Sequence, residues 1–185
     1  MSFSNKTLRI IFFTTLVIMA IAAVVFLISI ASQDEGPSEI SSFAQCVNSP
    51  DAVILETYPR QCRLNDGRTF SEGIGNELEK MDLIRIDNPR PNQEIKSPLV
   101  VSGEARGYWF FEASFPVRLY DANGNEIALA IAQAQGDWMT EDFVPYEAVL
   151  EFNTPATSTG VLVLEKDNPS GLPENADELV VPISF

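Results

Sequence analysis

Acidic side chains and two cysteines are the residues of this chain that could do chemistry. The 185 residues include 26 Asp or Glu and two Cys, Cys46 and Cys62, but no His. Without His there is no imidazole base and no His-ligated zinc, and two thiols are too few for a Cys-only zinc site. The acids that could pair for acid–base work are Glu112, Glu141, Asp142 and Glu147. On the strands and turns of so acidic a chain they indicate a solvated surface, so we predict no enzyme and no catalytic, cofactor-binding or metal-binding residue.

The loop that begins at Asp121 is the best candidate for a calcium site. An EF-hand loop has Gly at its sixth position and a bidentate Glu at its twelfth. Here Gly124 is fourth and Ala132 is twelfth. A hairpin turn with Asn or Gly in the left-handed region explains the loop better. The acidity of the chain still leaves a weak surface calcium site open.

Four aromatic residues, 108–111, form the most informative cluster for binding. Successive strand residues face opposite sides, so the cluster cannot enter one core. Trp109 and Phe111 share the parity of the apolar Phe115 and are expected inside. The candidate binding surface is therefore Arg106, Tyr108 and Phe110, for an anionic or carbohydrate partner. The alternative is that Tyr108 and Phe110 are covered by a neighbouring strand, by Trp138 or by the preceding module.

An uncharged apolar run precedes all of these residues. Residues 10–30 contain no charge, proline or glycine, and a helix of 21 residues spans roughly 31 Å, about one bilayer core. Basic residues precede the run and Asp34 follows it, which places the N-terminus in the cytoplasm. We predict a single-pass signal anchor in the lipid bilayer over residues 10–31. A signal peptide cleaved before Ser32 is the alternative, and both export residues 32–185.

Composition shifts along the chain predict its organisation. The predicted segments are a cytoplasmic tail at 1–9, the anchor at 10–31, a linker at 32–42, a small Cys-bracketed module at 43–73, a second linker at 74–82 and a β-domain at 83–185. The module suggests one short hairpin with a helical turn near Pro50. Because an exported segment lies in an oxidising compartment, Cys46 and Cys62 are expected to form a disulfide.

The last hundred residues predict an all-β fold. Seven alternating segments separated by turn residues are expected as strands near 83–87, 98–105, 111–121, 126–134, 143–152, 160–166 and 178–185. Alternation buries Phe111, Phe115, Val117 and Leu119 on one strand and Val144, Tyr146, Ala148, Leu150 and Phe152 on another. The last strand is expected to bury Leu179, Val181, Ile183 and Phe185. About seven short strands without helical periodicity favour an immunoglobulin-like β-sandwich.

The same residues resemble a known family. The segments 86–89, 95–103, 105–117, 136–140, 143–146, 168–171 and 181–185 are similar to the bacterial spore-germination immunoglobulin-like domain. The resemblance covers roughly residues 84–185 and implies an extracytoplasmic module, usually anchored to an envelope and without known catalysis. Residues 58–70 resemble a segment of Kazal protease inhibitors more weakly, since that family needs three disulfides and this chain allows only one.

These observations predict a membrane-anchored extracytoplasmic bacterial protein that binds or scaffolds at the cell envelope, related to spore-germination or sporulation-type envelope proteins. Its partner is expected to be an envelope protein or a glycan. A net charge of −14 with scattered basic residues excludes a nucleic-acid surface. The alternative function is a secreted or anchored protein of the protease-inhibitor or hydrolytic class.

Overall fold

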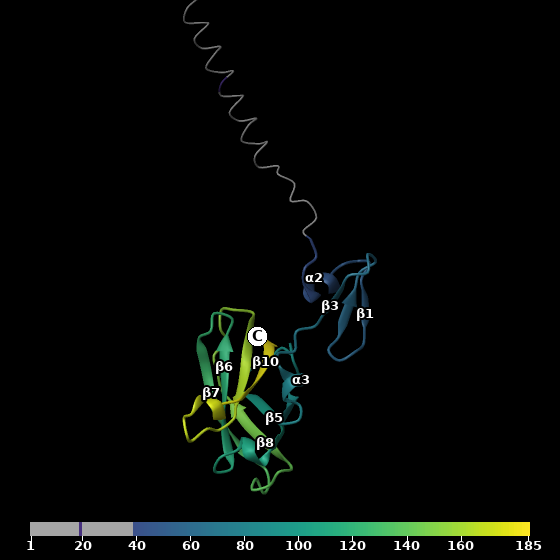
Figure 1. Cartoon of the computed structure of the whole chain (residues 1–185). Helices are drawn as coiled ribbons and strands as arrows, with labels where there is room; N and C mark the ends of the chain where they lie inside the picture. Colours follow the sequence, from purple (N-terminus) through teal and green to yellow (C-terminus); the bar gives the residue numbers. More distant parts are fainter. Residues whose placement is uncertain (1–18, 20–38) are drawn as a thin grey trace, which may run out of the picture. The chain divides into compact units, whose positions relative to one another are not determined.

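The computed structural model describes Met19 and residues 39–185. The predicted cytoplasmic tail, the anchor apart from Met19, and most of the first linker lie outside the described residues. Within the described part of the chain, no helix combines the length and apolar character needed to cross a membrane. The chain divides into two units, Met1–Ile40 and Ser41–Phe185, and the second contains all the elements below (Figure 1).

The disulfide module is a short helix packed on a three-stranded antiparallel sheet in the order β1-β2-β3. Its elements are α2 (Phe43–Val47), β1 (Val53–Leu55), β2 (Gln61–Arg63) and β3 (Thr69–Ser71). Ser42 caps the helix by accepting a hydrogen bond from the Gln45 amide at 3.2 Å. The expected single hairpin is thus corrected to three strands. The middle strand was missed because its three residues, of which only Cys62 is apolar, carry no readable alternation.

The predicted disulfide between Cys46 and Cys62 is confirmed, and it joins α2 to β2. Both cysteines are fully buried. β2 and β3 are connected by a tight turn in which Gly67 has a φ of 90°, a value that suits glycine. The disulfide and this turn together order a module that is too small to have much of a core.

Residues 74–82, predicted as a linker, contain α3 (Glu77–Lys80) and lie against the last strand, β10 (Glu178–Ser184). The Asn76 amide donates to the Val180 carbonyl at 3.3 Å, and the Val180 amide donates to the Asn76 side chain at 2.7 Å. Lys80 pairs with Asp177 at 2.5 Å. Gly75 permits this contact, since a Cβ there would lie 1.8 Å from the Val180 carbonyl oxygen.

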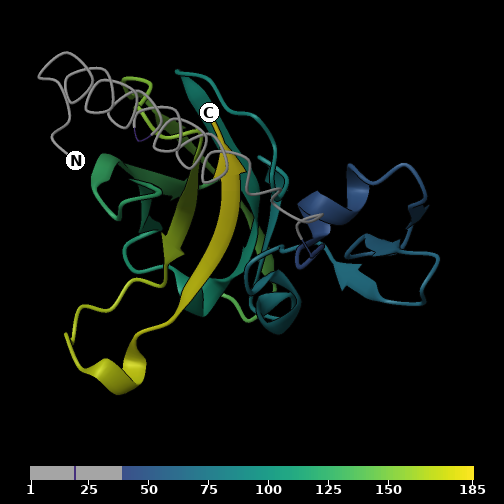
Figure 2. The same cartoon turned by 90° about the horizontal axis from the view of Figure 1, so that it is seen from above.

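The C-terminal domain is the expected all-β sandwich, built from one seven-stranded antiparallel sheet in the order β10-β9-β6-β7-β8-β5-β4. Besides β10, the strands are β4 (Ile84–Asn88), β5 (Leu99–Arg106), β6 (Ser114–Asp121), β7 (Glu126–Ala134), β8 (Phe143–Leu150) and β9 (Thr159–Glu165). Every strand end lies within three residues of the expected position. The β9–β10 loop carries the 3-10 helix η2 (Pro173–Asn175) and extends from the sandwich, as Figure 2 shows in yellow.

The sheet folds over on itself and nearly closes. β7 and β8 share only two residue pairs, Gln133 with Glu147 and Ala134 with Tyr146, so the sheet opens at that point. At the other end, the segment before β5 runs parallel to β10 and bridges it at Glu94 and Ser184. Strands β6 and β8 face each other across one core, where the rings of Phe115 and Tyr146 lie 5.0 Å apart, edge to face.

Strand alternation correctly identified this core. The buried residues include Phe115, Val117, Leu119, Val144, Tyr146, Ala148, Leu150, Leu179, Val181 and Ile183, as expected, while Phe152 and Phe185 are partly buried against them. Burial raises the pKa of Tyr146, whose hydroxyl donates to the Arg85 carbonyl at 2.9 Å. Gly103 makes room for this hydroxyl, because a Cβ there would lie 2.6 Å from it.

Candidate binding groove

The aromatic cluster predicted as a binding surface is split by the structure. Tyr108 is 49% exposed, as expected, but Phe110 is only 4% exposed and packs against Phe115 with ring centroids 5.2 Å apart. Phe111, expected inside, is 43% exposed. The cause is that this segment is not a strand: it contains the 3-10 helix η1 (Gly107–Trp109) and then a tight turn in which the backbones of Phe111 and Ser114 exchange hydrogen bonds, so β6 begins only at Ser114. Trp109 itself is fully buried, as predicted.

Arg106 is held by the domain rather than extended for a ligand. Its Nε donates to the Asp82 carbonyl at 3.0 Å and its Nη1 to the Glu141 carbonyl at 3.1 Å. Its guanidinium lies 4.1 Å from the centre of the Phe143 ring, and Arg85 lies at the same distance from that ring. Arg106 therefore connects the segments around η1 through hydrogen bonds and a cation–π contact. Of the three residues of the predicted surface, Tyr108 is the exposed one that makes no such contacts.

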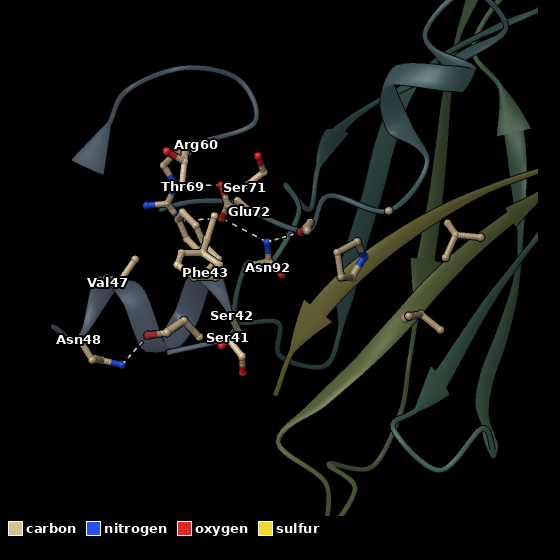
Figure 3. Close-up of a pocket in the computed structure, with 17 residues that line it drawn as sticks. Ser41, Ser42, Phe43, Val47, Asn48, Arg60, Thr69, Ser71, Glu72 and Asn92 are labelled. Atoms are coloured by element: carbon tan, nitrogen blue, oxygen red, sulfur yellow. Dashed lines mark hydrogen bonds and ion pairs between the residues drawn. The ribbon is translucent and has the colours of Figure 1, made fainter. Parts of the chain in front are cut away.

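A groove that the sequence did not reveal lies between the module and the sandwich. It has a volume of about 1000 Å³ (Figure 3). The module contributes residues of α2 and β3, and the sandwich contributes outward residues of β9 and β10. The apolar and aromatic lining residues are Phe43, Val47, Phe70, Val161, Val180 and Pro182. Such a largely apolar cleft with a few fixed polar groups is the usual form of a ligand site.

The polar groups of the groove are centred on Glu72. Arg60 donates two hydrogen bonds to the Glu72 carboxylate, at 2.9 and 2.6 Å, and these lower the pKa of that carboxyl. Asn92, from the sandwich, donates to the same carboxylate at 3.1 Å and to the Gly73 carbonyl at 2.8 Å. The Arg60 guanidinium also lies 5.6 Å from the centre of the Phe43 ring. Figure 3 shows these side chains converging on the groove.

A second polar cluster fastens the module to the sandwich. The Tyr58 hydroxyl donates to Glu77, and Arg90 donates to that hydroxyl at 2.7 Å. Arg90 also pairs with Glu77 at 3.1 Å, and the Glu77 side chain is only 10% exposed. Burial and the hydrogen bond to Glu77 raise the pKa of Tyr58 to about 12. The phenol therefore stays protonated near neutral pH and keeps donating to the carboxylate.

Sequence reasoning missed both clusters because they join distant segments. Arg60 and Glu72 face each other just beyond the β2–β3 ladder, where the Glu72 amide donates to the Arg60 carbonyl at 2.8 Å. Recognition of the middle strand would have revealed this cross-strand pair. Nothing in the sequence pattern could have brought Asn92 or Arg90 to the module.

In the loop considered for calcium, the Asp121 carboxylate is hydrogen-bonded to other residues of the same loop. Asp121 accepts hydrogen bonds from the amides of Asn123 and Asn125, both at 2.9 Å, and from the Asn125 side chain. These bonds lower the pKa of Asp121. Among residues 39–185, no three His, Cys, Asp or Glu side chains are grouped so that they could hold a metal ion.

Comparison with known proteins identifies one part of the chain. Residues 83–171 match the family model described as the immunoglobulin-like domain of bacterial spore germination. No curated protein and no solved structure matches the chain significantly. The matched range begins at β4 and includes β9, and β10 completes the sheet beyond it. The resemblance seen in the sequence is confirmed: a segment in the C-terminal half of this chain is similar to the immunoglobulin-like domain of bacterial spore germination.

Proposed function

We propose that this chain is a membrane-anchored extracytoplasmic protein that binds a neutral glycan of the cell envelope in the groove between its disulfide module and its immunoglobulin-like domain. Residues 10–31 hold it in the bilayer, with the N-terminus in the cytoplasm. The family of the C-terminal domain supports an envelope-related role.

The Cys46–Cys62 disulfide is the observation that carries the proposed location. Disulfides persist in oxidising compartments and are rare in the bacterial cytoplasm. The apolar run of residues 10–30 precedes the disulfide in the chain, with basic residues on its N-terminal side. The disulfide and the apolar run therefore both support an extracytoplasmic location for residues 32–185.

The chemistry of the groove supports a neutral, hydroxyl-rich ligand. Ser41, Ser42, Thr69, Ser71, Asn48 and Asn92 supply donors and acceptors along its walls. Phe43 and Phe70 supply apolar ring surface for the faces of sugar rings. The charge of Arg60 is already neutralised by Glu72, and the chain as a whole is strongly acidic. An anionic polymer is therefore disfavoured.

Co-sedimentation of the detergent-solubilised full chain with cell-wall glycan, stripped of proteins and anionic polymers, tests this proposal. Phe43→Ala removes an aromatic wall of the groove and is expected to weaken binding about tenfold, equivalent to 1.4 kcal/mol. Tyr108→Ala, on the exposed surface outside the groove, is the matched control and is expected to bind like the native chain.

Two outcomes would overturn the assignment. Loss of binding in Tyr108→Ala but not in Phe43→Ala would return the site to the surface around η1. Absence of glycan binding by the native chain would favour an envelope protein as the partner.

A further inference from the structure

Large apolar side chains are exposed on two loops at the end of the sandwich away from the C-terminus (Figure 1). Tyr108 and Phe111, between β5 and β6, are 49% and 43% exposed, and Met139, between β7 and β8, is 78% exposed. In the described part of the chain, no large hydrophobic side chain is exposed in the loops at the other end of the sandwich, residues 89–98, 122–125 and 151–158. Apolar side chains gathered at one place on a folded domain are typical of an interaction surface.

Backbone contacts bring the two loops together. The Gly107 amide donates to the Asp142 carbonyl at 3.2 Å. A Cβ at Gly107 would collide with the carbonyl oxygens of Trp138 and Thr140, the two neighbours of Met139 in the chain. Met139 therefore lies beside η1. The surface formed by the two loops is called the apolar tip, and its members are Tyr108, Phe111 and Met139.

The turn that follows Phe111 is strained. Glu112 and Ala113 have φ values of 49° and 63°, in the left-handed region. They are the central residues of a turn that the backbones of Phe111 and Ser114 close with two hydrogen bonds, at 3.0 and 3.1 Å. Turns with positive φ at both central residues favour Asn and Gly, so Glu and Ala raise the free energy of the fold there. Strain of this kind is concentrated at functional sites, and here it lies within the apolar tip.

The same two loops carry negative charge. Four exposed carboxylates have no ion-pair partner within residues 39–185, namely Glu112, Asp137, Glu141 and Asp142. Residues 106–113 and 135–142 contain one basic residue, Arg106. Its guanidinium is engaged by two backbone carbonyls and one aromatic ring. The apolar tip is therefore flanked by carboxylates whose charge is not compensated.

We propose that the apolar tip binds a basic protein. Lys or Arg side chains of that protein face the four carboxylates, and its apolar side chains pack on Tyr108, Phe111 and Met139. Aromatic residues and Met are enriched in protein interfaces, which surround an apolar centre with a polar rim. Opposite charges across the rim speed association and select the partner. This inference goes beyond the proposed glycan groove and does not depend on it.

The charge of the tip disfavours other occupants. An anionic bilayer surface, an anionic polymer or a second copy of this chain, with its net charge of −14, would bring negative charge onto the four carboxylates. The Arg106 guanidinium, which suggested an anionic partner in the sequence, is held by the carbonyls of Asp82 and Glu141. The glycan groove shares no residue with the apolar tip, so the two sites can be altered separately.

Photocrosslinking of the full-length protein in intact cells tests the proposal. Benzoylphenylalanine in place of Met139 is expected to capture a distinct polypeptide in which Lys and Arg outnumber Asp and Glu, as identified by mass spectrometry. The same amino acid in place of Asn123, exposed in a loop at the other end of the sandwich, is the control and is expected to give about tenfold less product. Equal capture at the two positions would overturn the proposal, as would a product that is a lipid, an acidic polypeptide or a second copy of this chain.

An apolar truncation in the Met139 crosslinking protein tests the centre of the surface. Phe111→Ser is expected to lower the yield of the crosslinked product about tenfold, because it removes aromatic contact area. Leu129→Ser, on β7, is the matched control, since Leu129 is 50% exposed but lies outside both loops. An unchanged yield in Phe111→Ser, with protease resistance retained, would contradict the apolar tip as the binding surface.

A charge reversal tests the chemistry of the partner. Glu141→Lys is expected to lower the yield of the crosslinked product about fivefold, because like charges would then meet at the rim. Glu151→Lys makes the same change in net charge at an exposed position beyond the end of β8, and is the control. Equal yields in Glu141→Lys and Glu151→Lys would rule out a basic partner. This comparison also decides the question should Phe111→Ser lose protease resistance, since Glu141 is exposed.

Discussion

Tyr108 and Phe110 lie two residues apart but have different surroundings, because η1 changes which side chains face the core. Phe110 is buried against Phe115, whereas half of the Tyr108 side chain is exposed. Phe110→Ala is expected to lower the free energy of unfolding by about 3–5 kcal/mol, the usual loss for a buried Phe. Tyr108→Ala is expected to lower it by less than about 1 kcal/mol. Urea unfolding of the full chain, followed by tryptophan fluorescence, measures both.

Equal losses of unfolding free energy in the two variants would show that Tyr108 and Phe110 are not buried to the different extents described here.

Gly107 allows the backbone of η1 to pack closely against residues 138–140. A Cβ at that position would lie 1.9 Å from the Thr140 carbonyl oxygen and 2.2 Å from that of Trp138. Close packing of two backbones therefore requires glycine at this position.

At the scale of elements, the disulfide module depends on its covalent link. Closing a loop of this size stabilises a fold by roughly 3 kcal/mol on the chain-entropy model. Reduction is therefore expected to increase amide exchange in β1, β2 and β3 while leaving β5 and β8 protected, because the sandwich has its own core. Hydrogen exchange before and after reduction, with Cys46→Ser/Cys62→Ser as a second route to the same state, measures this.

Labelling of Cys46 and Cys62 by a thiol reagent in the unreduced, denatured protein would refute the bridge. Loss of protection in the sandwich on reduction would show instead that the two parts fold as one cooperative unit. Where the disulfide is present, the groove is expected to be lost on reduction whether or not the sandwich also loses protection, because α2 and β3 form one of its walls.

At the scale of the whole molecule, the prediction concerns which parts of the chain lie outside the membrane. Glu174→Cys, in the exposed loop with η2, is expected to react with a membrane-impermeant maleimide in intact cells whose outer layers have been made permeable. Ser4→Cys, in the predicted cytoplasmic tail, is expected to react only after lysis. The native chain is the control, since its two cysteines are joined in the disulfide.

Reaction of Glu174→Cys only after lysis would place the domain in the cytoplasm and contradict the proposed function. Recovery of a secreted chain that begins at Ser32 would contradict the anchor but keep the domain outside. These outcomes do not depend on the glycan assignment, which the Phe43 variant tests separately.

The sequence by itself determined the seven strands of the sandwich and most of its core, because both rest on local alternation, and it determined the disulfide, because an exported segment with two cysteines allows one pairing. Alternation of apolar residues specifies which face of a strand is buried, and turn residues specify where strands end. The same rule failed at Phe110 and Phe111, because residues 107–113 form a 3-10 helix and a tight turn rather than part of a strand.

Only the tertiary structure decided the groove, the Tyr58–Glu77–Arg90 cluster and the short ladder between β7 and β8. Arg90 and Asn92 meet the module because residues 74–82 dock on β10, a contact between segments more than 100 positions apart. β7 and β8 are neighbours in the sheet although they pair at only two positions. Both depend on how strands are ordered and separated in space. Periodicity along one chain specifies which side of a strand is buried but not which strand lies beside it.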